Sequence, residues 1–163
     1  RSRQGVSSAA SDVYKRQYQD RVTLVSADGR LLVLGRTDLQ VQLETQLKVA
    51  ASGGPWLFGT RVLVETGGTT LMCLNLSDNL KPLWSVDLKG QSLAGAPLEA
   101  NGRLVVAQHQ GTVFTIETAS GKTGPSQNLG QPIQLGPRRF GKKVLVTSID
   151  GTLYRVESLL AEE

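Results

Sequence analysis

The segment Lys143–Val156, KVLVTSIDGTLYRV, is the last of four gapless repeats that decide the fold. The other three are RVTLVSADGRLLVL at Arg21–Leu34, RVLVETGGTTLMCL at Arg61–Leu74 and RLVVAQHQGTVFTI at Arg103–Ile116. Successive repeats begin 40, 42 and 40 residues apart. A nearly constant period of this length is typical of an architecture in which one supersecondary unit is repeated along the chain.

Each repeat has the pattern of a β-hairpin. A Val- and Leu-rich run such as Val144–Val146 favours a strand, and its lack of alternation indicates a strand that is covered on both faces. A glycine follows at the turn, as Gly29, Gly111 or Gly151, and supplies the positive φ that tight hairpin turns require. In the second repeat Gly67-Gly68 stands one residue earlier. Apolar residues then resume, so each segment predicts two antiparallel strands.

Two further features complete a four-stranded unit. Pro55, Pro97 and Pro137 each lie six residues upstream of a repeat. Because proline has no N–H to donate, we interpret it as the beginning of the innermost strand. The equivalent position in the first repeat is Lys15. Turn-forming residues after each hairpin lead into stretches such as Trp84–Leu88, which predict the outer strand.

Four short strands in each period predict an all-β fold, a partial β-propeller of about 3.5 four-stranded antiparallel blades that is truncated at the N-terminus. The repeats are expected at approximately residues 18–52, 53–94, 95–134 and 135–159. Because closed propellers have about four to eight blades, we do not expect this chain alone to close a ring. Its uncovered edge is expected to promote self-association.

Residues 1–17 share no period with the rest of the chain, and we expect a non-native or disordered segment there. Val6–Gln17, VSSAASDVYKRQ, resembles translated sequencing-adapter read-through of the kind found in metagenomic assemblies. A native, disordered basic tail is the alternative. The whole chain has 18 basic and 14 acidic residues, but the first 17 hold four of the basic and one of the acidic. The remaining net charge of +1 does not favour a nucleic-acid partner.

The quoted residues resemble the PQQ-like, or quinoprotein-like, β-propeller repeats over residues 20–159. The turn and aromatic of Asp150–Tyr154, the Gly-Lys turn of Thr118–Lys122 and the tryptophan of Lys81–Trp84 carry the resemblance. It implies that Trp84 is a blade-packing residue rather than a platform for a quinone. The aligned position in the next unit is expected to be Ser126.

Members of this family that oxidise alcohols or sugars combine a quinone with a calcium ion held by Glu, Asn and Asp, and often with a vicinal disulfide. Here Cys73 is the one cysteine, which excludes such a disulfide within the chain. We therefore predict no catalytic, cofactor-binding or metal-binding residues and no cofactor. Cys73 is expected to be a small buried hydrophobe, and His109, the one histidine, an ordinary loop residue. The basic group Arg138, Arg139, Lys142 and Lys143 is interpreted as a solvated hairpin loop rather than an anion-binding site.

Two functional hypotheses follow from the resemblance. The first is a non-catalytic bacterial module for protein–protein interaction or sensing, similar to the lipoprotein subunit of the outer-membrane barrel-assembly machinery or to sensor domains of bacterial Ser/Thr kinases. Such a module would have a protein partner, the remainder of its own propeller as a neighbour, and a periplasmic or extracytoplasmic location. The second is a fragment of a PQQ-dependent alcohol or sugar dehydrogenase whose cofactor site lies in a missing part. No apolar run is long enough to predict a transmembrane segment.

Overall fold

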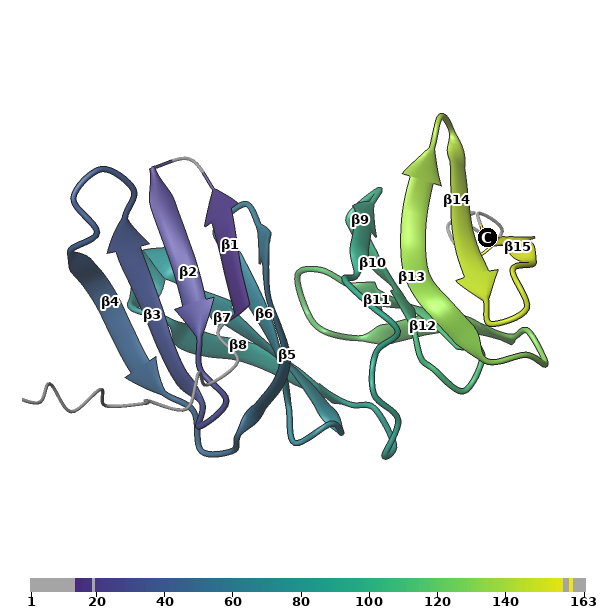
Figure 1. Ribbon diagram of the computed structural model, residues 1–163, viewed down its shortest axis with the longest axis horizontal. Coiled ribbons are helices and arrows are strands. Elements are labelled where there is room, and N and C mark those ends of the chain that lie inside the picture. The colour runs from purple at the N-terminus through teal and green to yellow at the C-terminus, as the bar shows by residue number, and fades with distance from the viewer. Residues whose placement is uncertain (1–13, 19, 157–158, 160–163) are drawn as a thin grey trace, which may run out of the picture.

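The computed structural model describes residues 14–18, 20–156 and 159, and within them the chain forms fifteen strands, one short 3-10 turn and four antiparallel sheets. Figure 1 shows the sheets following one another in chain order, with the first and the last at opposite ends of the molecule. We call them blades 1 to 4. The all-β partial propeller predicted from the sequence is confirmed.

Blades 1 to 3 have four strands each, and blade 4 has three among the described residues. Blade 1 consists of β1 (Tyr14–Tyr18), β2 (Arg21–Val25), β3 (Arg30–Gly35) and β4 (Val41–Gln46). Blade 2 consists of β5 (Ala51–Phe58), β6 (Arg61–Thr66), β7 (Thr70–Asn75) and β8 (Lys81–Asp87), with the turn η1 (Leu76–Asp78) before β8. Blade 3 consists of β9 (Leu98–Ala100), β10 (Arg103–Ala107), β11 (Thr112–Glu117) and β12 (Thr123–Asn128). Blade 4 consists of β13 (Ile133–Phe140), β14 (Lys143–Ser148) and β15 (Leu153–Arg155).

The quoted hairpins form the middle of every blade. In blade 1 the Ser26 N–H donates to the Arg30 carbonyl at 3.0 Å, and the Gly29 N–H donates back to the Ser26 carbonyl at 2.9 Å. Gly29 has a φ of 88°, in the left-handed region that a side chain disfavours. The same pair of hydrogen bonds recurs at residues 108–112 and 148–152. The turn glycines therefore supply the positive φ that their place in the repeat predicts.

The proline markers lie differently from the prediction. Pro97 directly precedes β9, but Pro55 and Pro137 lie inside β5 and β13, where the pairing with the next strand shifts register. A bulge releases a residue from the hydrogen-bond ladder, so a residue without an N–H fits there. The expectation that the proline begins the innermost strand is wrong for these two blades. Their first strands begin at Ala51 and Ile133, two residues before the expected repeat boundaries.

The expected non-native or disordered segment of residues 1–17 lies mostly outside the described residues. Its last four residues, however, belong to β1, which pairs with β2 so that Lys15 lies opposite Leu24. The edge of β2 offers backbone donors and acceptors that an extended segment of almost any sequence can satisfy. Residues 14–17 thus lie in a strand, and the expectation of a non-native or disordered segment over residues 1–17 stays a prediction.

Consecutive blades pack face to face, and each junction is an apolar core. We call the side of a blade that meets the next blade its forward face and the other side its rear face. In blade 2 the forward face carries Leu63, Leu71 and Cys73, and the rear face carries Val62, Val64 and Leu74. The three cores join blade 1 to blade 2, blade 2 to blade 3 and blade 3 to blade 4. Among the described residues, no helix has the length and apolar character needed to cross a membrane.

Candidate functional site

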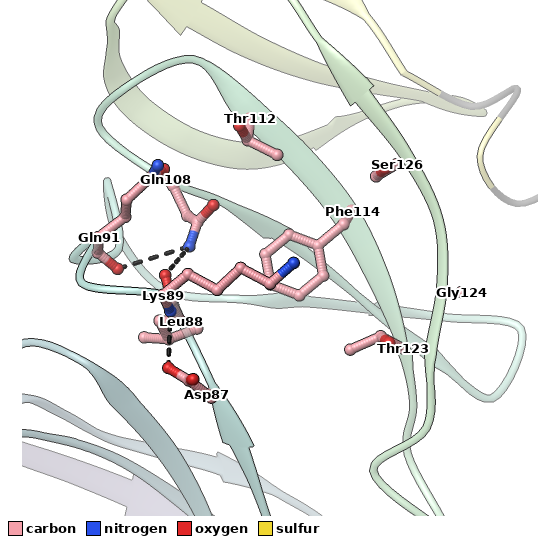
Figure 2. Close-up of a pocket in the computed structure, with 10 residues that line it drawn as sticks. All are labelled: Asp87, Leu88, Lys89, Gln91, Gln108, Thr112, Phe114, Thr123, Gly124 and Ser126. Atoms are coloured by element: carbon pink, nitrogen blue, oxygen red, sulfur yellow. Dashed lines mark hydrogen bonds between the residues drawn. The ribbon is translucent and has the colours of Figure 1, made fainter.

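A cleft of about 290 Å³ opens at the junction of blades 2 and 3 (Figure 2). It is lined by Asp87, Leu88, Lys89, Gln91, Gln108, Thr112, Phe114, Thr123, Gly124 and Ser126. One wall comes from the end of β8 and the loop that follows it, and the other from β11 and β12. The register places Phe114 opposite Ser126, so both side chains lie on the rear face of blade 3 and face the loop.

Hydrogen bonds hold the loop wall in place. The buried amide of Gln108 donates from Nε2 to the Leu88 carbonyl at 2.8 Å and to the Gln91 carbonyl at 3.5 Å (Figure 2). Asp87 Oδ1 accepts from the Lys89 N–H at 2.7 Å, and the Leu88 N–H donates to the Thr69 carbonyl at 2.7 Å. The loop is thus pinned to both neighbouring blades. Because the walls are already fixed, few side chains or loop residues need to become ordered when a ligand binds, and the entropy cost of binding is small.

The lining chemistry suits hydrogen bonding rather than bond making. Amide and hydroxyl groups dominate, and the nearly buried Phe114 supplies an aromatic surface. Gln91 Oε1 is buried and has no hydrogen-bond partner among the described residues. Asp87 and Lys89 contribute one charge of each sign. Such a mixture fits a polar or aromatic side chain of a peptide better than a strongly charged ligand.

Trp84 closes the same junction, on the forward face of blade 2. Its Nε1 donates to the Thr118 carbonyl at 3.1 Å, and its side chain packs against the core between blades 2 and 3. Gly121 allows this contact, because a Cβ there would lie 2.7 Å from Cγ of the indole. The structure therefore places Trp84 between blades, where the resemblance put it.

The position that corresponds to Trp84 in blade 3 is not Ser126. Trp84 lies opposite Cys73 and Ser85 opposite Met72, whereas Ser126 lies opposite Phe114, which aligns with Met72. Ser126 is therefore equivalent to Ser85. The true counterpart falls in the register shift at Gly124-Pro125, where a Cβ on Gly124 would lie 2.5 Å from Thr115 Oγ1. The error arises because a bulge removes the constant offset that a gapless alignment assumes.

Glu65 is a buried acid that the sequence analysis did not single out. Only 3% of it is exposed, at the junction of blades 2 and 3. Its Oε2 accepts from the Leu93 N–H at 3.3 Å, while Oε1 is buried without a partner among the described residues. Burial raises the pKa of this carboxyl, against smaller opposing effects of the Leu93 N–H, Ser52 and His109. The aligned residues in the other three repeats are Val25, Ala107 and Thr147, all uncharged. An acidic residue at this position of the repeat is therefore the sequence feature by which Glu65 could have been found.

The other candidate residues are scattered. Cys73 is fully buried, and burial raises the pKa of its thiol to about 12. His109 is exposed, with Nδ1 3.1 Å from the Ile133 carbonyl oxygen. Of the basic group at the β13–β14 turn, Arg138 donates to the Pro137 carbonyl and Arg139 to the Glu99 carbonyl, while Lys142 and Lys143 are exposed. Across residues 14–18, 20–156 and 159, no three His, Cys, Asp or Glu residues are grouped so as to hold a metal ion.

Comparison with known proteins places these features in context. The sequence profile of a family described as outer membrane protein assembly factor BamB matches residues 20–123 and, in a second placement, residues 79–162. No curated protein matches the chain in sequence.

Several solved structures have the same fold. BamB from Moraxella catarrhalis superposes with a TM-score of 0.72 at 16% identity, over 92% of this chain and 47% of that one. The computationally designed Ika4 protein gives 0.72 at 15% identity, over 93% of this chain and 94% of that one. BBS1N, solved in complex with ARL6DN, superposes with a TM-score of 0.66 at 19% identity, over 86% of this chain and 45% of that one. The chain thus spans about half the length of the first and third of these structures.

Proposed function

Because the chain belongs to the PQQ-like β-propeller family whose profile is described as outer membrane protein assembly factor BamB, we propose that it is a non-catalytic module that binds protein partners. The finer roles are part of the same proposal, namely a bacterial scaffold or sensor module outside the cytoplasm. Two neighbours support it: BamB, whose family description names an assembly factor, and BBS1N, which was solved with a protein bound.

The cleft between blades 2 and 3 carries the proposal, because it lies beside a free strand edge. β12 is the outermost strand of blade 3, and among the described residues it pairs with β11 alone. All six of its residues are exposed. An extended peptide can add to such an edge through backbone hydrogen bonds while one of its side chains enters a neighbouring pocket. Pro125 interrupts the edge, which limits open-ended pairing and favours a short partner segment.

A display selection of random peptides on the immobilised 163-residue chain tests this mode. We expect enriched peptides to bind wild type, and Ser126→Trp, which fills the cleft, to weaken the selected peptides at least about tenfold. Ser85→Trp is the matched control, because Ser85 occupies the same strand position in blade 2 and is also exposed. It should leave the affinity unchanged. Selection of no peptide, or equal binding by the Ser126→Trp variant, would contradict the proposal.

A titration with pyrroloquinoline quinone and calcium tests the absence of quinone chemistry in this part of the propeller. We expect no saturable change in the quinone absorbance on addition of the chain. A saturable change that calcium strengthens would instead favour the dehydrogenase fragment, whatever the peptide selection gives.

A further inference from the structure

The alternation of hydrogen bonds along β12 determines which of its residues can pair with an added strand. The Leu129 N–H, just beyond the strand, donates to the Gly111 carbonyl at 3.0 Å. Because bonded and non-bonded pairs alternate in an antiparallel ladder, the backbone of Gln127 faces β11 in the same way. The N–H and C=O groups of Ser126 and Asn128 then point away from β11, toward the free edge. These two residues offer four backbone hydrogen bonds to a partner strand.

The cleft lies where an added strand would place one of its side chains. Residues that are paired across two strands have their side chains on the same face of the sheet. Ser126 lies opposite Phe114, and both line the cleft on the rear face of blade 3 (Figure 2). A residue that pairs with Ser126 from the free edge therefore directs its side chain toward the cleft, while its two chain neighbours point to the opposite face.

The cleft requires a hydrogen-bond donor from that side chain. Gln91 Oε1 is buried and has no hydrogen-bond partner among the residues that the structure describes. The Gln91 backbone is already held, because its carbonyl accepts from Gln108 Nε2 at 3.5 Å and its N–H donates to the Leu88 carbonyl at 3.1 Å. An apolar side chain would exclude water and leave the oxygen unpaired, which is unfavourable. A carboxylate is also excluded, since it has no proton to donate.

The remaining lining favours a neutral aromatic group. Phe114 is 8% exposed, and an offset or edge-to-face contact with a second ring would stabilise a complex. The cleft volume of about 290 Å³ lies near the lower end of small-molecule pockets, so a large side chain fits. Lys89 lines the same cleft and repels a second cation. Elsewhere at this junction Trp84 already combines aromatic packing with a donated hydrogen bond.

We propose that the partner is an extended peptide with a tryptophan that pairs with Ser126, and that its indole N–H donates to Gln91 Oε1 beside the ring of Phe114. The peptide runs antiparallel to β12, the direction in which paired residues exchange both backbone hydrogen bonds. This assignment rests on the proposed function, because it takes β12 as the edge that binds a partner, and it adds the register and the recognised side chain. Pro125 has no N–H and limits the pairing on one side, so the tryptophan lies in a short segment.

Peptides selected by display on the 163-residue chain test the assignment, and we expect them to share a tryptophan. In synthetic copies, benzothienylalanine in place of that tryptophan keeps the shape and removes the N–H. It should weaken binding at least about fivefold in isothermal titration calorimetry. N-methylation of the tryptophan backbone nitrogen removes its hydrogen bond to the Ser126 carbonyl and should have a similar effect. N-methylation of the following residue, whose N–H faces away from β12, should leave binding unchanged.

Substitution of Gln91 tests the acceptor from the side of the protein. Gln91→Met removes the acceptor and keeps a side chain of similar length. It should weaken the tryptophan peptide at least about fivefold and cost the benzothienylalanine peptide nothing further. Gln127→Met is the matched control, because Gln127 is exposed and lies opposite Val113, on the face of β12 away from the cleft. It should leave both affinities unchanged. Far-UV circular dichroism establishes that each variant is folded.

Failure of this assignment and failure of the proposed function give different results. Selected peptides that lack tryptophan, but are still weakened by Ser126→Trp, would overturn the assignment and leave the proposed function standing. Equal binding of the tryptophan and benzothienylalanine peptides, or an unchanged affinity in Gln91→Met, would overturn it as well. Selection of no peptide at all would contradict both.

Discussion

Trp84 of blade 2 donates a hydrogen bond from Nε1 to the Thr118 carbonyl of blade 3, and Gly121 leaves room for its indole. This contact joins the outer strand of one blade to the turn between the two outer strands of the next. We expect Trp84→Ala to lower the free energy of unfolding by about 3–5 kcal/mol, since it leaves a cavity at a packed junction. Trp84→Phe retains most of the packing but loses the hydrogen bond, so we expect it to lower the free energy of unfolding by about 1 kcal/mol. Urea unfolding followed by circular dichroism measures both.

Gly121→Ala should also destabilise the chain, because it places a methyl group against the Trp84 ring and because Gly121 has a φ of 75°. The two effects separate in a double-mutant cycle. In the Trp84→Ala background the steric part disappears and only the backbone part remains, so the substitution should cost clearly less there. Equal costs in the two backgrounds would mean that the ring and the glycine do not act on one another.

Glu65 gives the junction of blades 2 and 3 a dependence on pH. Burial raises its pKa in the folded chain above the ordinary value of 4.5, so the folded state retains the proton at a pH where the unfolded state has lost it. The contribution of Glu65 to stability is therefore full below that ordinary value and is lost as the pH rises through the folded-state pKa. We expect the free energy of unfolding to fall in this window, with a slope of at most about 1.4 kcal/mol per pH unit from this group.

Urea unfolding of wild type and Glu65→Gln across the acid-to-neutral range checks this dependence. The variant should lose the falling slope while retaining the contribution of the other carboxylates. Asp28, Asp150 and Glu44 have pKa values lowered by hydrogen bonds to Ser26, Ser148 and Arg30, and so act with the opposite sign. The difference between the two curves isolates Glu65. Parallel curves would show that this carboxyl does not titrate differently in the folded and unfolded states.

The hairpins were predictable from the sequence because their determinants are local. A Val-rich run and a turn glycine such as Gly29 or Gly151 specify strand, turn and strand within about a dozen residues, and the period then gives the propeller. Bulges were not predictable, because a shift in register depends on the partner strand rather than on the strand that contains Pro55 or Gly124.

The candidate cleft was out of reach for a related reason. Its walls are formed within residues 87–91 and residues 108–126, which belong to different blades. Neither stretch contains a sequence motif that predicts its contact with the other. The site comes into being when blade 3 docks on blade 2. Glu65 was closer to recognition, since the aligned column shows an acid among Val25, Ala107 and Thr147. A comparison of charge at each aligned position, made alongside the comparison of glycines, would have identified Glu65 as the exception.

Cys73 should be unreactive until the chain unfolds. It is fully buried, and its thiol pKa of about 12 leaves very little thiolate at neutral pH. We expect iodoacetamide to label the native chain at least about a hundredfold more slowly than the urea-unfolded chain. An exposed cysteine in a Ser126→Cys variant provides the comparison within one protein. Fast labelling of native wild type would indicate that the core between blades 2 and 3 opens readily.

Gly111 and Gly151 occupy the same turn position in blades 3 and 4, but their surroundings differ. Both have positive φ, 102° and 86°, so alanine at either position meets the backbone penalty of about 1–2 kcal/mol. At Gly111 an added Cβ would also lie 2.5 Å from the Gln131 carbonyl oxygen. At Gly151 an added Cβ would meet no atom within 4 Å from the described part of the chain, apart from its own neighbours. We expect Gly111→Ala to cost distinctly more than Gly151→Ala in urea unfolding. Because the carbonyl belongs to the segment that enters β13, the extra cost measures how tightly the turn of blade 3 is held against blade 4. Equal costs would show that this segment moves aside freely.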